Sequence, residues 1–180
     1  PVTGNTTTAS ELRSLESWLT TNDSRGAGGS DGSSSAAATD GTQRPFTETL
    51  LKAVILSCFN AGGNPDTVMV CGFNKQQAST FTGNATRTKD TKDKKLNAAI
   101  DIYESDFGQM KIVANRFQRS RTAFVLEMDK FAIAYAPGRS FVSIDLAKTG
   151  DATKKTILSE YTLVVDNEAA SGVVADLTTA

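Results

Sequence analysis

The order of the hydrophobic periods along the chain constrains its fold more than any other feature. Apolar residues recur at helical spacing in the first part of the chain, and beyond residue 100 they alternate with polar residues, as in half-buried strands. Helices that precede a run of strands are typical of the α+β class. We therefore predict an α+β fold, with a mostly antiparallel sheet flanked by helices.

Two helices are predicted in the first third of the chain. The first covers residues 10–20, because Thr8 and Glu11 have the spacing of a capping box. The second begins after Thr47, a predicted N-cap, and ends at the glycine pair 62–63. Its predicted buried stripe consists of Leu50, Leu51, Val54, Ile55, Cys58 and Phe59.

Short strand-like segments account for most of the remaining apolar residues. A third helix is predicted over residues 74–81, with Asn74 as its cap. Asp106-Phe107-Gly108 separates two alternating runs and predicts a hairpin-like turn. The apolar positions are Ile100 and Ile102 in the first run, and Met110, Ile112 and Ala114 in the second. Residues 129–135 fit either a helical turn or a strand. The other predicted strands cover residues 67–71, 100–104, 110–114, 122–128, 141–146, 156–165 and 171–177.

Two polar segments interrupt these elements. Residues 21–46 are dominated by Gly, Ser and Ala without an apolar period, which predicts a flexible, protease-sensitive loop. Residues 82–95 are rich in lysine and predict a solvated loop or arm. No apolar run approaches the roughly 18 residues of a membrane span, so no membrane partner is expected.

The composition argues against an enzyme. The chain has 180 residues and no histidine, which excludes Ser-His-Asp and Cys-His catalysis and imidazole zinc sites. Cys58 and Cys71 end apolar segments and are predicted to be reduced core residues rather than a disulfide. No phosphate-binding loop is present, and the carboxylates Asp101, Glu104 and Asp106 fit the exposed side of a half-buried strand. We expect no catalytic residue, metal or cofactor.

The densest basic site is Arg116, Arg119 and Arg121 around Phe117, and Lys92 and Lys94 add charge in the lysine-rich segment. These residues fit a contact with a neighbouring subunit, a contact with packaged nucleic acid, or a plain surface turn. A net charge of −1 disfavours a dedicated nucleic-acid binder, which usually has a large basic excess.

Four short motifs occur in a fixed order: Tyr103 with Asp106-Phe107-Gly108, then Asn115-Arg116-Phe117, Thr149-Gly150-Asp151 and Glu160-Tyr161-Thr162-Leu163. Their joint order resembles the C-terminal half of tailed-bacteriophage major capsid proteins of the SU-ten-like branch. The segments LESWLTTND and ETLLKAVILSCFNAGGNPDTVMVCGFNKQQASTF extend this resemblance over nearly the whole chain.

The resemblance implies a Hong Kong 97-like capsid fold, with an axial domain around capsomer centres and a peripheral domain that links capsomers. It assigns residues 1–20 to the peripheral side, 21–46 to a loop, 47–141 to the axial domain and 142–180 to strands that return to the peripheral domain. The N-terminal arm, extended loop and spine helix of the family have no counterpart here, so we expect a C-terminal fragment.

The function that the resemblance implies is structural. The subunits would self-associate as pentamers and hexamers of an icosahedral head, assembled in the bacterial cytoplasm, and would enclose DNA through non-specific contacts. The alternative is a nucleic-acid-associated binding module of phage or prophage origin that uses residues 89–95 and 116–121.

Overall fold

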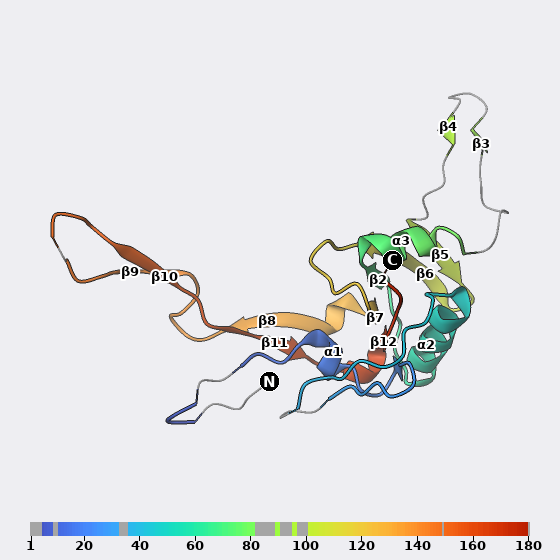
Figure 1. Cartoon of the computed structure of the whole chain (residues 1–180), viewed down its shortest axis with the longest axis horizontal. Helices are drawn as coiled ribbons and strands as arrows, with labels where there is room; N and C mark the ends of the chain where they lie inside the picture. The colour runs from blue at the N-terminus through green and yellow to red at the C-terminus, as the bar shows by residue number, and fades with distance from the viewer. Residues whose placement is uncertain are drawn as a thin grey trace.

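The protein consists of a head and a long arm that leaves it (Figure 1). The head is built on a six-stranded sheet, and the arm, residues 131–165, consists of two successive two-stranded ribbons. No helix in the part of the chain described here is long and apolar enough to cross a membrane. The computed structural model describes residues 5–8, 11–32, 36–81, 89–90, 95–96, 101–148 and 150–179.

The sheet of the head is mixed. Three of its strand pairs are antiparallel and two are parallel, so the prediction of a mostly antiparallel sheet holds only by a narrow margin. In spatial order the strands are β1 (Asp23–Ser24), β12 (Gly172–Val174), β7 (Ala123–Leu126), β2 (Thr67–Val70), β6 (Gly108–Ala114) and β5 (Ile102–Ser105).

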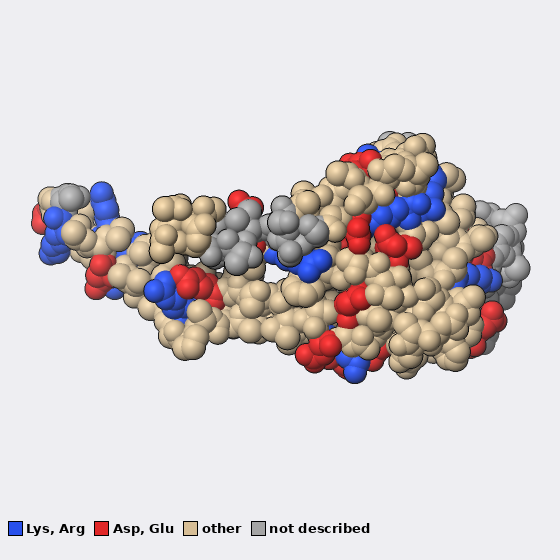
Figure 2. Space-filling model, turned by 90° about the horizontal axis from the view of Figure 1, so that it is seen from below, with Lys and Arg blue, Asp and Glu red and all other residues tan. Residues whose placement is uncertain are grey.

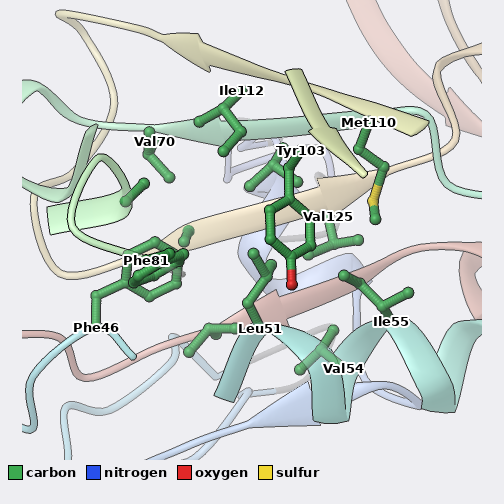
Figure 3. Close-up of a cluster of buried hydrophobic side chains, with 14 of the residues drawn as sticks. Phe46, Leu51, Val54, Ile55, Val70, Phe81, Tyr103, Met110, Ile112 and Val125 are labelled. Carbon is green, nitrogen blue, oxygen red and sulfur yellow. The ribbon is translucent and has the colours of Figure 1, made fainter. Parts of the chain in front are cut away.

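Helix α2 (Glu48–Asn60) covers one face of this sheet and closes the main core (Figure 3). It begins at the predicted N-cap, since the Thr47 hydroxyl oxygen accepts a hydrogen bond from the Leu50 N–H at 3.4 Å. Four residues of the predicted stripe are buried: Leu51, Val54, Ile55 and Cys58. Phe59 is exposed instead, because its ring stacks on the exposed ring of Phe107 and does not enter the core.

The other two helix predictions are wrong in their bounds. Helix α1 is a single turn, Leu15–Trp18, and Thr8 belongs to a separate turn in which its N–H donates to the Asn5 side chain at 2.8 Å. Helix α3 spans Gly72–Ala78 and is capped by the Cys71 sulfur. Asn74 does not cap it, because its side-chain amide donates to the Ser120 carbonyl at 2.8 Å.

The hairpin β5–β6 turns at the predicted Asp106-Phe107-Gly108, but the phase of β5 is opposite to the prediction. Tyr103 is buried, whereas Ile102 is 61% exposed. The Tyr103 hydroxyl donates to the Glu48 carboxylate of α2 at 3.0 Å, so the buried ring keeps a partner for its polar group. Residue 100 lies outside the described residues.

The Gly/Ser-rich segment, predicted to be a flexible and protease-sensitive loop, makes more regular backbone contacts than its composition suggests. It contains β1, which pairs with β12, and its residues 25–44, here called the strap, form bridges between Ser30 and Thr39 and between Arg44 and Leu177. Gly26 is needed for close packing rather than for flexibility, because a Cβ there would lie 2.1 Å from the Thr42 carbonyl oxygen. Residues 33–35 lie outside the described residues.

The arm is an extension of two neighbouring strands of the sheet. After β7 the chain passes through the short helix η2 (Met128–Lys130) into β8 (Phe131–Tyr135), so residues 129–135 contain both predicted alternatives. The returning strand β11 (Tyr161–Val165) leads through η3 (Glu168–Ala170) into β12. The last strand, β12, therefore pairs with β7 inside the head, and the division into axial and peripheral domains stays a prediction.

The predicted strand 156–165 is interrupted by a corner. It divides into β10 (Lys155–Leu158), which pairs with β9 (Val142–Asp145), and β11, which pairs with β8. The Glu160 N–H donates to the Arg139 carbonyl, and the Ala136 N–H donates to the Glu160 carbonyl, both at 3.0 Å. These bonds fix the corner between a proximal ribbon, β8/β11, and a distal ribbon, β9/β10.

The two cysteines are buried and free, as predicted. Burial raises the pKa of the Cys58 thiol to about 12, so this group stays protonated and unreactive near neutral pH.

The buried face of α2 should contribute much more to the free energy of unfolding than its exposed face. Leu51→Ala should lower the free energy of unfolding by about 2–5 kcal/mol, because it removes a fully buried side chain and leaves a cavity. Leu56→Ala, a matched change on the exposed side of the same helix, should change it by roughly 0.5 kcal/mol or less. Urea unfolding of dilute protein measures both, and equal effects would contradict the assigned core.

Candidate assembly surface

The proximal ribbon carries large apolar side chains on one face and small ones on the other. The register pairs Tyr135 with Tyr161 and Ile133 with Leu163, and alternate residues of a strand share a face. These four side chains, together with Phe131 and Val165, therefore form one apolar face. The rings of Tyr135 and Tyr161 lie 6.1 Å apart.

Most of this face is not covered by the head. Phe131 packs against the buried cluster of Leu19, Phe124, Leu126 and Val173 and anchors the root of the arm. Farther out, Ile133 is 59% exposed and Tyr161 is 50% exposed. A two-stranded ribbon is marginally stable without further packing, so this exposed face is suited to cover by another surface.

The distal ribbon continues the pattern. Val142 and Ile144 share a face with Leu158, while Ile157, 72% exposed, lies on the opposite face. In the part of the chain described here, each ribbon has two strands, so both outer edges present unpaired backbone groups. The arm therefore offers both apolar side chains and strand edges.

A second exposed apolar surface, here called the head patch, consists of Leu56, Phe59 and Phe107. The rings of Phe59 and Phe107 stack with their centroids 4.6 Å apart, which joins α2 to the β5–β6 turn. Leu56 and Phe107 line a hollow of about 370 Å³, and Lys52 and Asp106 lie at the same hollow.

The three arginines of the predicted basic site do not act as one group in the structure. Arg119 pairs with Asp40 and Glu16, and Arg121 pairs with Asp40 and Asp176. The hydrogen bond from Arg119 lowers the pKa of the Asp40 carboxyl and raises the pKa of the Arg119 guanidinium. These two arginines hold the strap against the head, which leaves little of their charge for an external anion.

The other predicted contact residues do not join this network. Arg116 and Phe117 lie in the exposed turn after β6, where the Asn115 side chain accepts a hydrogen bond from the Phe117 N–H at 3.0 Å. Lys92 and Lys94 lie outside the described residues. The predicted intersubunit or DNA contacts of these side chains remain predictions.

The carboxylates of β5 and of the residues that flank it do not come together as a metal site with any other described residue. Asp101 pairs with Lys75 at 3.1 Å, and Glu104 and Asp106 are exposed. Within the described ranges, no three Cys, Asp or Glu side chains gather closely enough to hold a metal ion.

Comparison with known families places the chain among the major capsid proteins of bacteriophages. Residues 1–178 match the family model described as SU10 major capsid protein. The chain therefore belongs to the SU10 major capsid protein family, as the ordered motifs predicted, and is a component of the virion capsid. No curated protein matches the chain.

Sequence reasoning missed both apolar surfaces. The sequence marks Glu160-Tyr161-Thr162-Leu163 as a family motif, but its local pattern does not predict that Tyr161 lies on an exposed face. The sequence does contain a signal for the surface on the arm. Residues 131–135, FAIAY, are apolar at every position, and a proline and a glycine follow them, so no helix follows directly in the sequence that could cover a strand there. A strand that is apolar on both faces needs cover on both, which the local sequence cannot specify.

The anchoring of the strap predicts a specific stability defect. The Asp176 carboxylate is buried and accepts hydrogen bonds from the Gly26 N–H at 3.0 Å and the Gly41 N–H at 2.7 Å. Asp176→Ala should lower the free energy of unfolding by about 1–3 kcal/mol, because it leaves these donors unpaired. It should also accelerate trypsin cleavage after Arg25, which is followed by Gly26 in the strap.

Asp176→Asn is the matched control for this prediction. Asparagine keeps an acceptor oxygen and tolerates the left-handed backbone of residue 176, where φ is 59°. It should therefore lose less stability than the alanine variant. An Asp176→Ala protein with the stability and the cleavage rate of the original protein would show that the carboxylate does not hold the strap.

Proposed function

We propose that this chain is a shell subunit that self-associates into capsomers of the phage head through its arm. The observation that carries the proposal is the apolar face of the proximal ribbon, which extends beyond the head and remains largely exposed. Capsid-family membership supports the same role, and it gives no support for an enzyme.

The size of the exposed surface suits repeated contacts of modest strength. Fully burying one large apolar side chain contributes about 1.5–3 kcal/mol. Several such residues on each arm give a contact that forms readily when many copies are present, and a closed shell repeats it throughout. Weak individual contacts also allow misplaced subunits to dissociate during assembly.

We further propose a Hong Kong 97-like arrangement, in which the head acts as the axial part of a pentamer or hexamer and the arm reaches towards neighbours. The six-stranded sheet under α2 provides a self-contained core for an axial domain. The strands that leave from β7 and return to β12 provide a peripheral extension.

The nucleic-acid-binding alternative finds less support. Arg119 and Arg121 pair with acidic side chains of the same chain, and the net charge is −1. A shell that encloses DNA needs only non-specific contacts on its inner surface, for which exposed Arg116 is available.

Electron microscopy of the complete product of the gene that encodes this chain tests the proposal. We expect closed shells or capsomer rings. Dispersed monomers across a range of concentration and salt, in protein that is fully folded by circular dichroism, would contradict it.

The apolar face of the proximal ribbon predicts a variant that folds but does not assemble. Ile133→Asn with Tyr161→Asn should remove most assembled material, because it places polar amides where a neighbour would bury apolar groups. The thermal unfolding midpoint should stay within a few degrees of the original value, since both side chains lie outside the core. Sedimentation velocity measures the assembled fraction.

Ala134→Asn with Thr162→Asn is the control, because it introduces the same amides on the opposite face of the same paired strands. This variant should retain more assembled material than the first. The same loss of assembly from both variants would mean that the large apolar face has no special part in the contact.

A further inference from the structure

We propose that the distal ribbon of one subunit docks on the head patch of the next subunit. This inference rests on the proposed self-association and identifies the two surfaces that meet. The occupant of the head patch is thus a second copy of this chain, and specifically the face of its β9/β10 ribbon that carries Val142 and Ile144.

The docking face of the distal ribbon is longer than the two strands alone. The Leu146 N–H donates to the Lys154 carbonyl at 2.9 Å, which continues the antiparallel ladder by one residue pair. Leu146 and Lys154 therefore lie opposite each other, on the same face as Ile144 and Leu158. Thr156, opposite Ile144, is the one polar residue within this otherwise apolar face, which ends in the cationic Lys154 side chain.

The head patch has the complementary character. Its exposed ring pair, Phe59 and Phe107, lies beside a hollow of about 370 Å³, large enough to receive one or two aliphatic side chains. Leu56 borders the same hollow and is 46% exposed. Ile144 and Leu146 on the ribbon provide side chains of the corresponding size and shape.

The charges at the two surfaces have opposite signs. Lys52 at the hollow is paired with Glu48 at 2.9 Å, which leaves Asp106 as the additional charge beside the patch. At the arm tip, Lys155 is paired with Asp145 at 3.1 Å, and Lys148 and Lys154 make no ion pair with the described residues. The exposed Asp151 lies in the same tip loop, so the lysines exceed the carboxylates there by one charge. Figure 2 shows basic side chains at the tip next to acidic ones, and a further group of basic and acidic side chains partway along the arm.

The placement of the two surfaces makes the contact intermolecular. The distal ribbon lies at one end of the molecule, and α2 with the β5–β6 turn lies at the opposite end of the head (Figure 1). A chain with a docking ribbon at one end and its receptor at the other forms heterologous, head-to-tail contacts. Such contacts close into rings when the rotation between subunits permits, as a capsomer requires.

Disulfide trapping tests which surfaces meet. The variant Ile144→Cys/Leu56→Cys places one thiol on each proposed surface, and the native thiols of Cys58 and Cys71 are buried. Oxidation of assembled protein with copper phenanthroline should give a ladder of covalent oligomers on non-reducing gels. Ile144→Cys and Leu56→Cys proteins mixed before assembly should give cross-linked dimers and no ladder, because each carries one reactive surface.

Ile157→Cys/Leu56→Cys is the matched control, since Ile157 is on the opposite face of the ribbon. It should cross-link at least fivefold more slowly. Equal rates for the two double variants, or no ladder from Ile144→Cys/Leu56→Cys, would overturn the proposed contact. If the particles still form in that case, self-association stands and only this assignment fails; absence of particles from the unmodified protein would instead count against the proposed function.

A charge exchange provides an independent check on the same contact. Lys154→Glu and Asp106→Lys should each reduce the rate of the Ile144→Cys/Leu56→Cys cross-link, and the two changes together should restore most of it. Unchanged rates in both single variants, or no recovery in the combined variant, would show that the cationic end of the docking face does not face the head patch.

Discussion

The packing at the root of the arm is the interaction on which the rest of the structure depends. Phe131 enters the buried cluster around Leu19, Phe124 and Val173, and the Asp166 N–H donates to the Lys130 carbonyl at 3.0 Å across the two strands that leave the head. Because β7 and β12 are paired neighbours in the sheet, the arm begins from a rigid base. The apolar proximal ribbon is therefore held away from the core of the head and does not fold back onto it.

This arrangement divides the hydrophobic surface between folding and assembly. The head buries its own apolar side chains between α2 and the sheet, where Leu51, Ile55 and Val125 are fully or almost fully buried. The arm and the head patch keep apolar side chains that the chain does not cover. For a major capsid protein, such a division allows a subunit to fold first and to bury its remaining apolar surface against other copies.

Local signals predicted the elements that local interactions control. The Thr47 cap, the extent of α2 and the turn at Gly108 followed from side-chain chemistry within a few residues. Predictions failed where a distant partner competed with a local one. Asn74 bonds to Ser120 rather than capping a helix, and the bond from Tyr103 to Glu48 accompanies the reversed phase of β5.

The sequence by itself determined the α+β class, the Thr47 cap, the turn before Gly108, the absence of histidine chemistry and the family, because these depend on residue type and short spacing. Tertiary structure alone decided that the Gly/Ser-rich segment is fastened to Asp176, about 150 positions along the chain from Gly26, and that β12 returns to the sheet beside β7. It also decided which apolar residues remain exposed on the arm. Exposure depends on what packs against a strand, and contacts between distant segments are not encoded in the local period of the residues that make them.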